Sequence, residues 1–126
     1  LLAKHSRHVT TIEADKNLYD RGKEKLRSHN IEVLFGNSAE LIENAIIKYL
    51  KAGFCNLNFF LDGHYSGPGT SNLYGETPIL QELEIIKRYL KKFKSCHILI
   101  DDFSLYKNII LINNEIKYIK FTYICY

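Results

Sequence analysis

The feature that most constrains this chain is a regular alternation, from residue 8 to residue 101, of short β-branched or aromatic runs with longer amphipathic runs. Strands are predicted at residues 8–13, 31–35, 57–61 and 97–100, and helices at residues 14–28, 39–52 and 78–90. Strands that alternate with helices of this length form βα units around a parallel sheet. The sequence therefore predicts an α/β fold with a mostly parallel sheet and flanking helices.

Local signals mark where the predicted helices begin and end. Ser38 is the predicted N-cap of the helix over residues 39–52, and Gly53 is its predicted stop. Thr77 is the predicted cap of the next helix, with Pro78 at the first helical position. Apolar residues then recur on a 3.6-residue period, which predicts a buried helix face made by Ile79, Leu80, Leu83, Ile86 and Leu90.

Size and composition indicate one domain over residues 1–126. A chain of 126 residues, 46% of them hydrophobic, buries one core. The periodic pattern degrades after Phe103, so residues 104–126 are predicted to be an irregular tail, with a hairpin over 109–124 as one alternative. No apolar run approaches the ~20 residues that cross a bilayer, so no membrane partner is predicted.

Charge and cysteine content exclude further classes. The formal net charge is +3, and basic residues concentrate in one segment near a predicted helix end, where cations suit the helix dipole: Lys87, Arg88, Lys91, Lys92 and Lys94. This distribution argues against a nucleic-acid partner. Three cysteines, Cys55, Cys96 and Cys125, are unevenly spaced in or beside apolar runs, which favours reduced thiols and a cytoplasmic location.

Polar residues follow every predicted strand at its carboxyl end. They are Glu13 after the first, Asn37 and Ser38 after the second, Asp62 and His64 after the third, and Asp101 and Asp102 after the fourth. Ligands of doubly wound sheets bind outside the carboxyl ends of the strands. A Gly-, Ser- and Pro-rich loop at residues 63–77 is longer than a turn requires, as functional loops often are. A small-molecule site is therefore predicted at this rim.

Five segments in order carry a family resemblance: IEAD at 12–15, VLFGNSAELI at 33–42, FFLDGHYSG at 59–67, TPILQELEII at 77–86 and ILIDDF at 98–103. Over residues 1–103 the chain resembles class I S-adenosylmethionine-dependent methyltransferases, in particular small bacterial O-methyltransferase-like proteins related to the macrocin type. The resemblance implies a Rossmann-like fold. The family's glycine-rich cofactor turn has no counterpart, because the only GxG is Gly67-Pro68-Gly69 in the long loop. The chain is thus expected to lack the first βα unit, as an N-terminally truncated fragment.

The resemblance also implies roles for the strand-end residues. The implied cofactor-binding residues are Glu13, Asn37, Ser38 and Asp62. Glu13 would bind the ribose hydroxyls of S-adenosylmethionine, and Asn37 and Ser38 would lie beside the adenine. For each of these, interaction with the next helix N-terminus or an ordinary turn is the structural alternative.

The remaining implied roles are catalytic and metal-binding. His64 is the implied general base, with Asp62 beside it in the catalytic set; the alternative for His64 is an exposed loop histidine. Asp62, Asp101 and Asp102 match positions that bind Mg²⁺ in metal-dependent members, and three carboxylates brought together need a cation or a proton. The alternative is that these acids cap loops or face solvent.

Two functions of different class follow from these observations. The first is methyl transfer from S-adenosylmethionine to the oxygen of a small molecule or a sugar, by a fragment of such an enzyme. The second is a non-catalytic, degenerate remnant that serves as a binding scaffold or has no function. The sequence itself indicates neither the methyl acceptor nor an oligomeric state.

Overall fold

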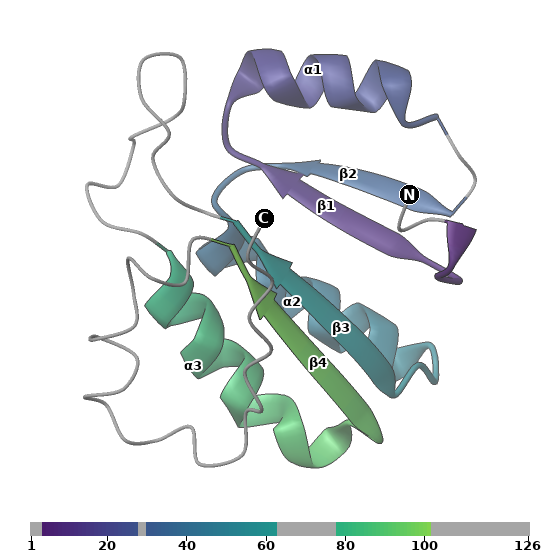
Figure 1. The fold of residues 1–126 in the computed structure, drawn as a ribbon, viewed down its shortest axis with the longest axis vertical. Coiled ribbons are helices and arrows are strands. Elements are labelled where there is room, and N and C mark those ends of the chain that lie inside the picture. The colour runs from purple at the N-terminus through teal and green to yellow at the C-terminus, as the bar shows by residue number, and fades with distance from the viewer. Residues whose placement is uncertain (1–3, 28–29, 63–77, 102–126) are drawn as a thin grey trace.

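The computed structural model describes residues 4–27, 30–62 and 78–101, and strands alternate with helices throughout these ranges (Figure 1). The predicted α/β alternation is therefore confirmed. The elements in chain order are β1 (Val9–Glu13), α1 (Lys16–Lys25), β2 (Ile31–Phe35), α2 (Ser38–Lys51), β3 (Asn56–Leu61), α3 (Ile79–Tyr89), a short 3-10 helix (Leu90–Lys92) and β4 (Ser95–Ile100).

The described strands form two separate parallel sheets of two strands each. β1 pairs with β2, with Val9 opposite Ile31, and β3 pairs with β4, with Leu61 opposite Ile100. All four strands point toward the same side of the molecule (Figure 1). The parallel direction agrees with the sequence-based prediction, but one continuous sheet is not present among the described residues.

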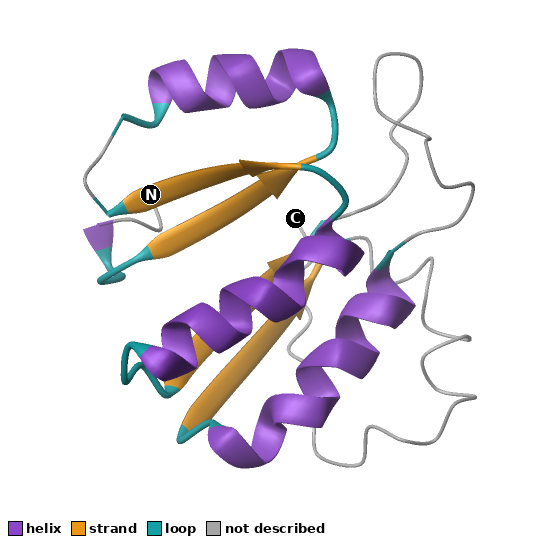
Figure 2. Cartoon of the chain, turned by 180° about the vertical axis from the view of Figure 1, so that it is seen from behind, coloured by secondary structure: helices purple, strands orange, loops and turns teal. Residues whose placement is uncertain are grey.

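Helices lie on both faces of these strands. α2 and α3 cover one face of β3 and β4 (Figure 2), whereas α1 lies against β2, where Tyr19 packs on Phe35 with ring centroids 5.3 Å apart. The core lies under α2 and α3 and consists of Ile42, Ile46, Leu61, Ile79, Leu83, Ile85 and Ile86. α1 has no fully buried residue, so most of the apolar burial holds the β3–β4 half together.

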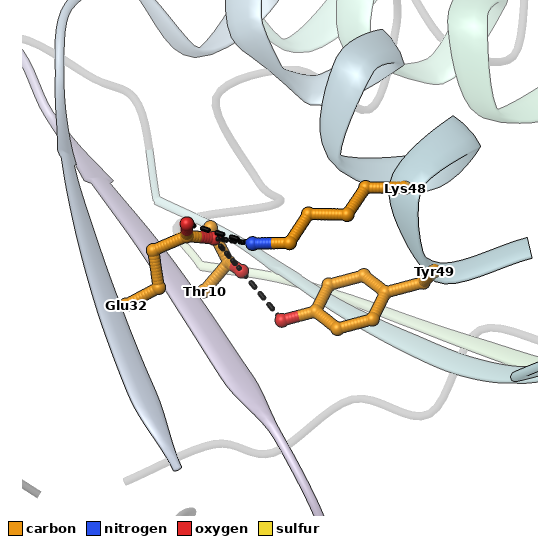
Figure 3. A network of polar contacts seen from close by, with 4 residues as sticks. All are labelled: Thr10, Glu32, Lys48 and Tyr49. Carbon is orange, nitrogen blue, oxygen red and sulfur yellow. Dashed lines mark hydrogen bonds and ion pairs between the residues drawn. The ribbon is translucent and has the colours of Figure 1, made fainter. Parts of the chain in front are cut away.

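A polar network joins α2 to the β1–β2 pair (Figure 3). Lys48 Nζ donates to both carboxylate oxygens of Glu32 at 2.7 Å, and Thr10 Oγ1 lies 3.2 Å from Glu32 Oε2 and 2.6 Å from Tyr49 Oη. The hydrogen bond from Lys48 lowers the pKa of Glu32 and correspondingly raises that of Lys48. Because the ion pair is exposed, it contributes little to the free energy of unfolding. We assign it a role in orienting α2.

Helix ends differ from the predicted ones by one to three residues. The N-cap of α2 is Asn37 and not Ser38, which is already the first helical residue. Pro78 is the cap residue of α3 and not its first helical residue, which is Ile79, so α3 begins one residue later than predicted; Thr77, the predicted cap, lies outside the described residues. α1 ends at Lys25, earlier than predicted, whereas Gly53 follows α2 with a φ of +84°, as its predicted role as stop requires.

Two of the three cysteines fall in the described part of the chain. Cys55 and Cys96 are half-buried thiols, and burial raises the pKa of Cys96 to about 11, so it stays protonated at neutral pH. Cys125, the tail over 104–126 and the alternative hairpin over 109–124 lie outside the described residues. Within residues 4–27, 30–62 and 78–101, no helix is long and apolar enough to cross a bilayer.

Candidate functional site

The predicted site lies where the strands end, and backbone hydrogen bonds tie these ends together in pairs. Gly36 N–H donates to Glu13 C=O at 3.0 Å, which joins the ends of β1 and β2. Asp101 N–H donates to Leu61 C=O at 3.0 Å, which joins the ends of β3 and β4. Since all four strands point the same way (Figure 1), the strand-end residues that the structure describes lie on one rim of the molecule.

Glu13 is the last residue of β1 and is half-buried. Its Oε1 accepts a hydrogen bond of 2.8 Å from the N–H of Asp15, the N-cap of α1. This contact is the structural alternative considered for Glu13, an interaction with the following helix N-terminus. A carboxylate has about four acceptor positions in total. One bond to Asp15 thus leaves Glu13 able to accept from ribose hydroxyls as well.

Asn37 and Ser38 form the turn from β2 into α2. Asn37 Oδ1 accepts from Ala39 N–H at 3.0 Å, so its side chain is engaged as a cap. Ser38 hydrogen-bonds to Glu82 of α3. Both residues hold the first turn of α2 at the rim, and its backbone N–H groups point toward the side where the strands end.

Gly36 sets the shape of this turn. Its φ is +144°, and a Cβ at this position would lie 2.9 Å from Leu41 Cδ1. We expect Gly36→Ala to lower the free energy of unfolding by about 1–3 kcal/mol, because alanine is strained at such a φ. Thermal or urea unfolding checks this value. Gly22→Ala is the matched control: it lies inside α1 with nothing within 4 Å of a new Cβ, and a gain in helix propensity is expected there. Equal destabilisation by both substitutions would contradict this account of Gly36.

Asp62 and Asp101 follow β3 and β4 directly, and both are exposed. They are neighbours across the rim, because Leu61 and Ile100 before them are paired in register. His64, the predicted general base, and Asp102, the third predicted metal ligand, lie outside the described residues. Among those that are described, no group of three His, Cys, Asp or Glu side chains could hold a metal ion. The Mg²⁺ site therefore stays a prediction.

Glu82 is a candidate residue that the sequence analysis missed. Its side chain is buried between α3 and the start of α2, with 3% of the residue exposed, and its Oε2 has no hydrogen-bond partner. Burial raises the pKa of Glu82, and the hydrogen bond with Ser38 opposes that shift. One signal was available: this acid falls within the apolar stripe of α3, three residues after Ile79 and one before Leu83.

A hollow of about 430 Å³ lies elsewhere, between α1 and the amino-terminal half of β2. Ile31 and Val33 form its floor, and charged side chains of α1, including Asp20, Lys23 and Arg27, form its wall. Ile31 is the first residue of β2 and lies at the end of the strand opposite to the rim. The wall residues are exposed, and solvated charges of this kind fix no ligand orientation. We therefore place the candidate site at the rim.

Comparison with known proteins adds no relative to this description. No protein-family model matches the chain, and no match was found among curated proteins or among solved structures.

Proposed function

We propose that this chain is a fragment of an S-adenosylmethionine-dependent methyltransferase that methylates an oxygen of a small molecule or a sugar. The observation that supports this proposal most is the convergence of Glu13, Asn37, Ser38, Asp62 and Asp101 on one rim of parallel βα units. Such a rim, with helix N-termini behind it, suits a nucleoside-containing cofactor. The family resemblance of residues 1–103 is the reason for proposing methyl transfer as the reaction.

Each residue at the rim would have a separate role in binding or catalysis. Glu13 would accept hydrogen bonds from both vicinal ribose hydroxyls, because a carboxylate can accept from two donors at once. Asn37 and Ser38 would border the adenine, and Asp62 would lie between the cofactor and the acceptor. His64 would remove the proton from the acceptor hydroxyl. The bound cofactor supplies the electrophilic methyl group.

A Mg²⁺ ion is a second candidate cofactor. Asp62 and Asp101 are exposed neighbours that offer hard oxygen ligands, and Asp102 is the predicted third. If held there, the ion would lower the pKa of the acceptor hydroxyl. Such a role makes methyl transfer sensitive to chelators, and full transfer in excess chelator would remove the metal from the proposal.

An NMR titration of residues 1–126 with S-adenosylmethionine tests the cofactor site. We expect weak binding, with a dissociation constant well above the micromolar range. The amide chemical shifts of Gly36, Ser38 and Asp62 should change. Glu13→Ala should weaken binding about tenfold or more, because each hydrogen bond to a charged group is worth about 1.5–3 kcal/mol. Glu24→Ala, which removes an exposed acid from α1, should leave the affinity unchanged.

The alternative function is a non-catalytic remnant that serves as a scaffold. One observation favours it: Asn37 already caps α2, and Glu13 already accepts a hydrogen bond from Asp15, the N-cap of α1. In that case the titration gives no shifts at the rim, or gives shifts that Glu13→Ala does not change. Either result would reject the proposed cofactor site.

A further inference from the structure

Glu82 is a buried acid that has no part in the proposed methyl transfer. It lies in the first turn of α3, and α3 runs beside α2 in the same direction, so that both helices begin at the rim (Figure 2). Ser38, the first residue of α2, hydrogen-bonds to the Glu82 carboxyl. Glu82 therefore lies between two helix N-termini and touches a residue of the candidate site.

Ser38 is the polar partner of this carboxyl among the described residues. Burial raises the pKa of Glu82, and the hydrogen bond with Ser38 lowers it. Glu43 of α2 is bonded instead to Tyr89 at the opposite end of α3, and Cys96 of β4 reaches the core as a neutral thiol. Other charged side chains on the neighbouring elements and at the rim are exposed, among them Glu40, Asp62, Glu84, Lys91, Lys92 and Asp101.

The side chain of Ser38 is not needed to begin α2, because Asn37 caps that helix. Ser38 is half-buried, so it lies between the closed interior that holds Glu82 and the open rim. The two helix N-termini carry partial positive charge, which favours a negative charge on the acid between them. This arrangement suits a carboxylate that acts on the rim through Ser38.

The hydrogen bond between the two side chains has one possible direction when Glu82 is ionised. A carboxylate only accepts, so the Ser38 hydroxyl donates its single hydrogen to Glu82. The hydroxyl oxygen keeps its lone pairs and can then only accept from a further group. A protonated Glu82 can donate instead, which frees the Ser38 hydrogen to turn toward another acceptor.

We propose that Glu82 is a positioning residue of the rim, which accepts the Ser38 hydroxyl hydrogen from the side of α3 and leaves the hydroxyl oxygen to accept from a ligand. The ligand group that fits ionised Glu82 is therefore a hydrogen-bond donor. This step rests on the proposed function, in which Ser38 borders the adenine. The amino group of adenine is a donor, whereas the oxygen in its place in hypoxanthine is an acceptor. Glu82 and Ser38 together thus select adenine over hypoxanthine.

Carbon-13 NMR of residues 1–126 across a pH series tests the positioning without any ligand. The side-chain carbons of Glu82 and Ser38 should titrate with one shared midpoint, and Glu82→Met should remove the transition at Ser38. Ser38→Ala should move the Glu82 midpoint upward, because the hydrogen bond that favours the ionised form is lost. Glu84→Gln changes an exposed acid on the same helix and should alter neither signal. A Ser38 transition that persists in Glu82→Met, or a Glu82 midpoint that Ser38→Ala leaves in place, overturns the proposal.

NMR titrations with adenosine and with inosine test the selection. On the alkaline side of the Glu82 transition, adenosine should bind about tenfold more tightly than inosine, because inosine sets an acceptor against an acceptor. The preference should shrink on the acid side, and Glu82→Met should show little preference on either side. Equal affinities in the wild type, or an unchanged preference in Glu82→Met, reject the selection. If neither nucleoside binds, the proposed cofactor site and the selection fail together, and the ligand-free titration still decides whether Glu82 positions Ser38.

Discussion

Replacing Ile86 by alanine is expected to lower the free energy of unfolding by about 2–5 kcal/mol, the usual cost of removing a large aliphatic side chain from a closed core. Ile86 is 0% exposed and lies in the cluster that joins α2, α3 and β3. The cost includes the lost transfer free energy and the cavity that remains. Because small domains have only about 5–15 kcal/mol in total, this one change removes a large share of the stability.

Urea unfolding monitored by circular dichroism measures this loss. Should Ile86→Ala fail to fold, Ile86→Val keeps the measurement possible, with an expected cost of about 0.5–1.5 kcal/mol. The matched control is Leu18→Ala in α1, where the side chain is 41% exposed and the expected change is within about 0.5 kcal/mol. Similar losses for Ile86→Ala and Leu18→Ala would show that the α2–α3 core does not dominate stability.

The elements themselves were predictable because their signals are local. The 3.6-residue stripe of α3 and the β-branched run of β2 are readable from a few neighbouring residues, and β2 falls at the predicted residues 31–35. The predicted positions of the helix ends were less accurate than the predicted elements. Asn37 and Ser38 are both favourable N-cap residues. Which of them caps α2 depends on where the turn that begins at Gly36 ends.

Strand pairing was only partly predictable, since it depends on residues far apart in the chain. The direction of the strands followed from the βα rhythm, but the division into a β1–β2 pair and a β3–β4 pair is a property of the whole packing. The shared rim was predictable for the same reason as the strand direction. The contact of Glu13 with Asp15 was foreseen only as an alternative, and the contact of Ser38 with Glu82 was not foreseen.

Glu82 controls the second large expected effect, a fall in stability as pH rises. Burial raises the pKa of Glu82 above its ordinary value of 4.5, so the carboxyl binds its proton more tightly in the folded chain than in the unfolded one. Below pH 4.5 both states are protonated and the contribution to stability is fully present. As pH rises from 4.5 through the folded pKa, the unfolded state loses its proton first, and that stability is lost.

The reason for the loss is the environment of the carboxylate at neutral pH. Once ionised, Glu82 would be a buried charge whose Oε2 has no partner, with Ser38 as its hydrogen-bond donor. A buried polar group left without a partner costs about 1–3 kcal/mol, and more when it is charged. Glu82→Met removes both the charge and the unpartnered oxygen at similar length, so we expect it to raise the free energy of unfolding at pH 7 by about that amount.

Urea unfolding of the wild type and of Glu82→Met between pH 4 and pH 8 measures the effect. The two curves should converge toward the acid end and separate as pH rises, because only the wild type has this group to ionise. Glu84→Gln changes an exposed acid on the same helix and should follow the wild-type curve. A constant difference between wild type and Glu82→Met at every pH would mean that packing, and not ionisation, sets the cost of this residue.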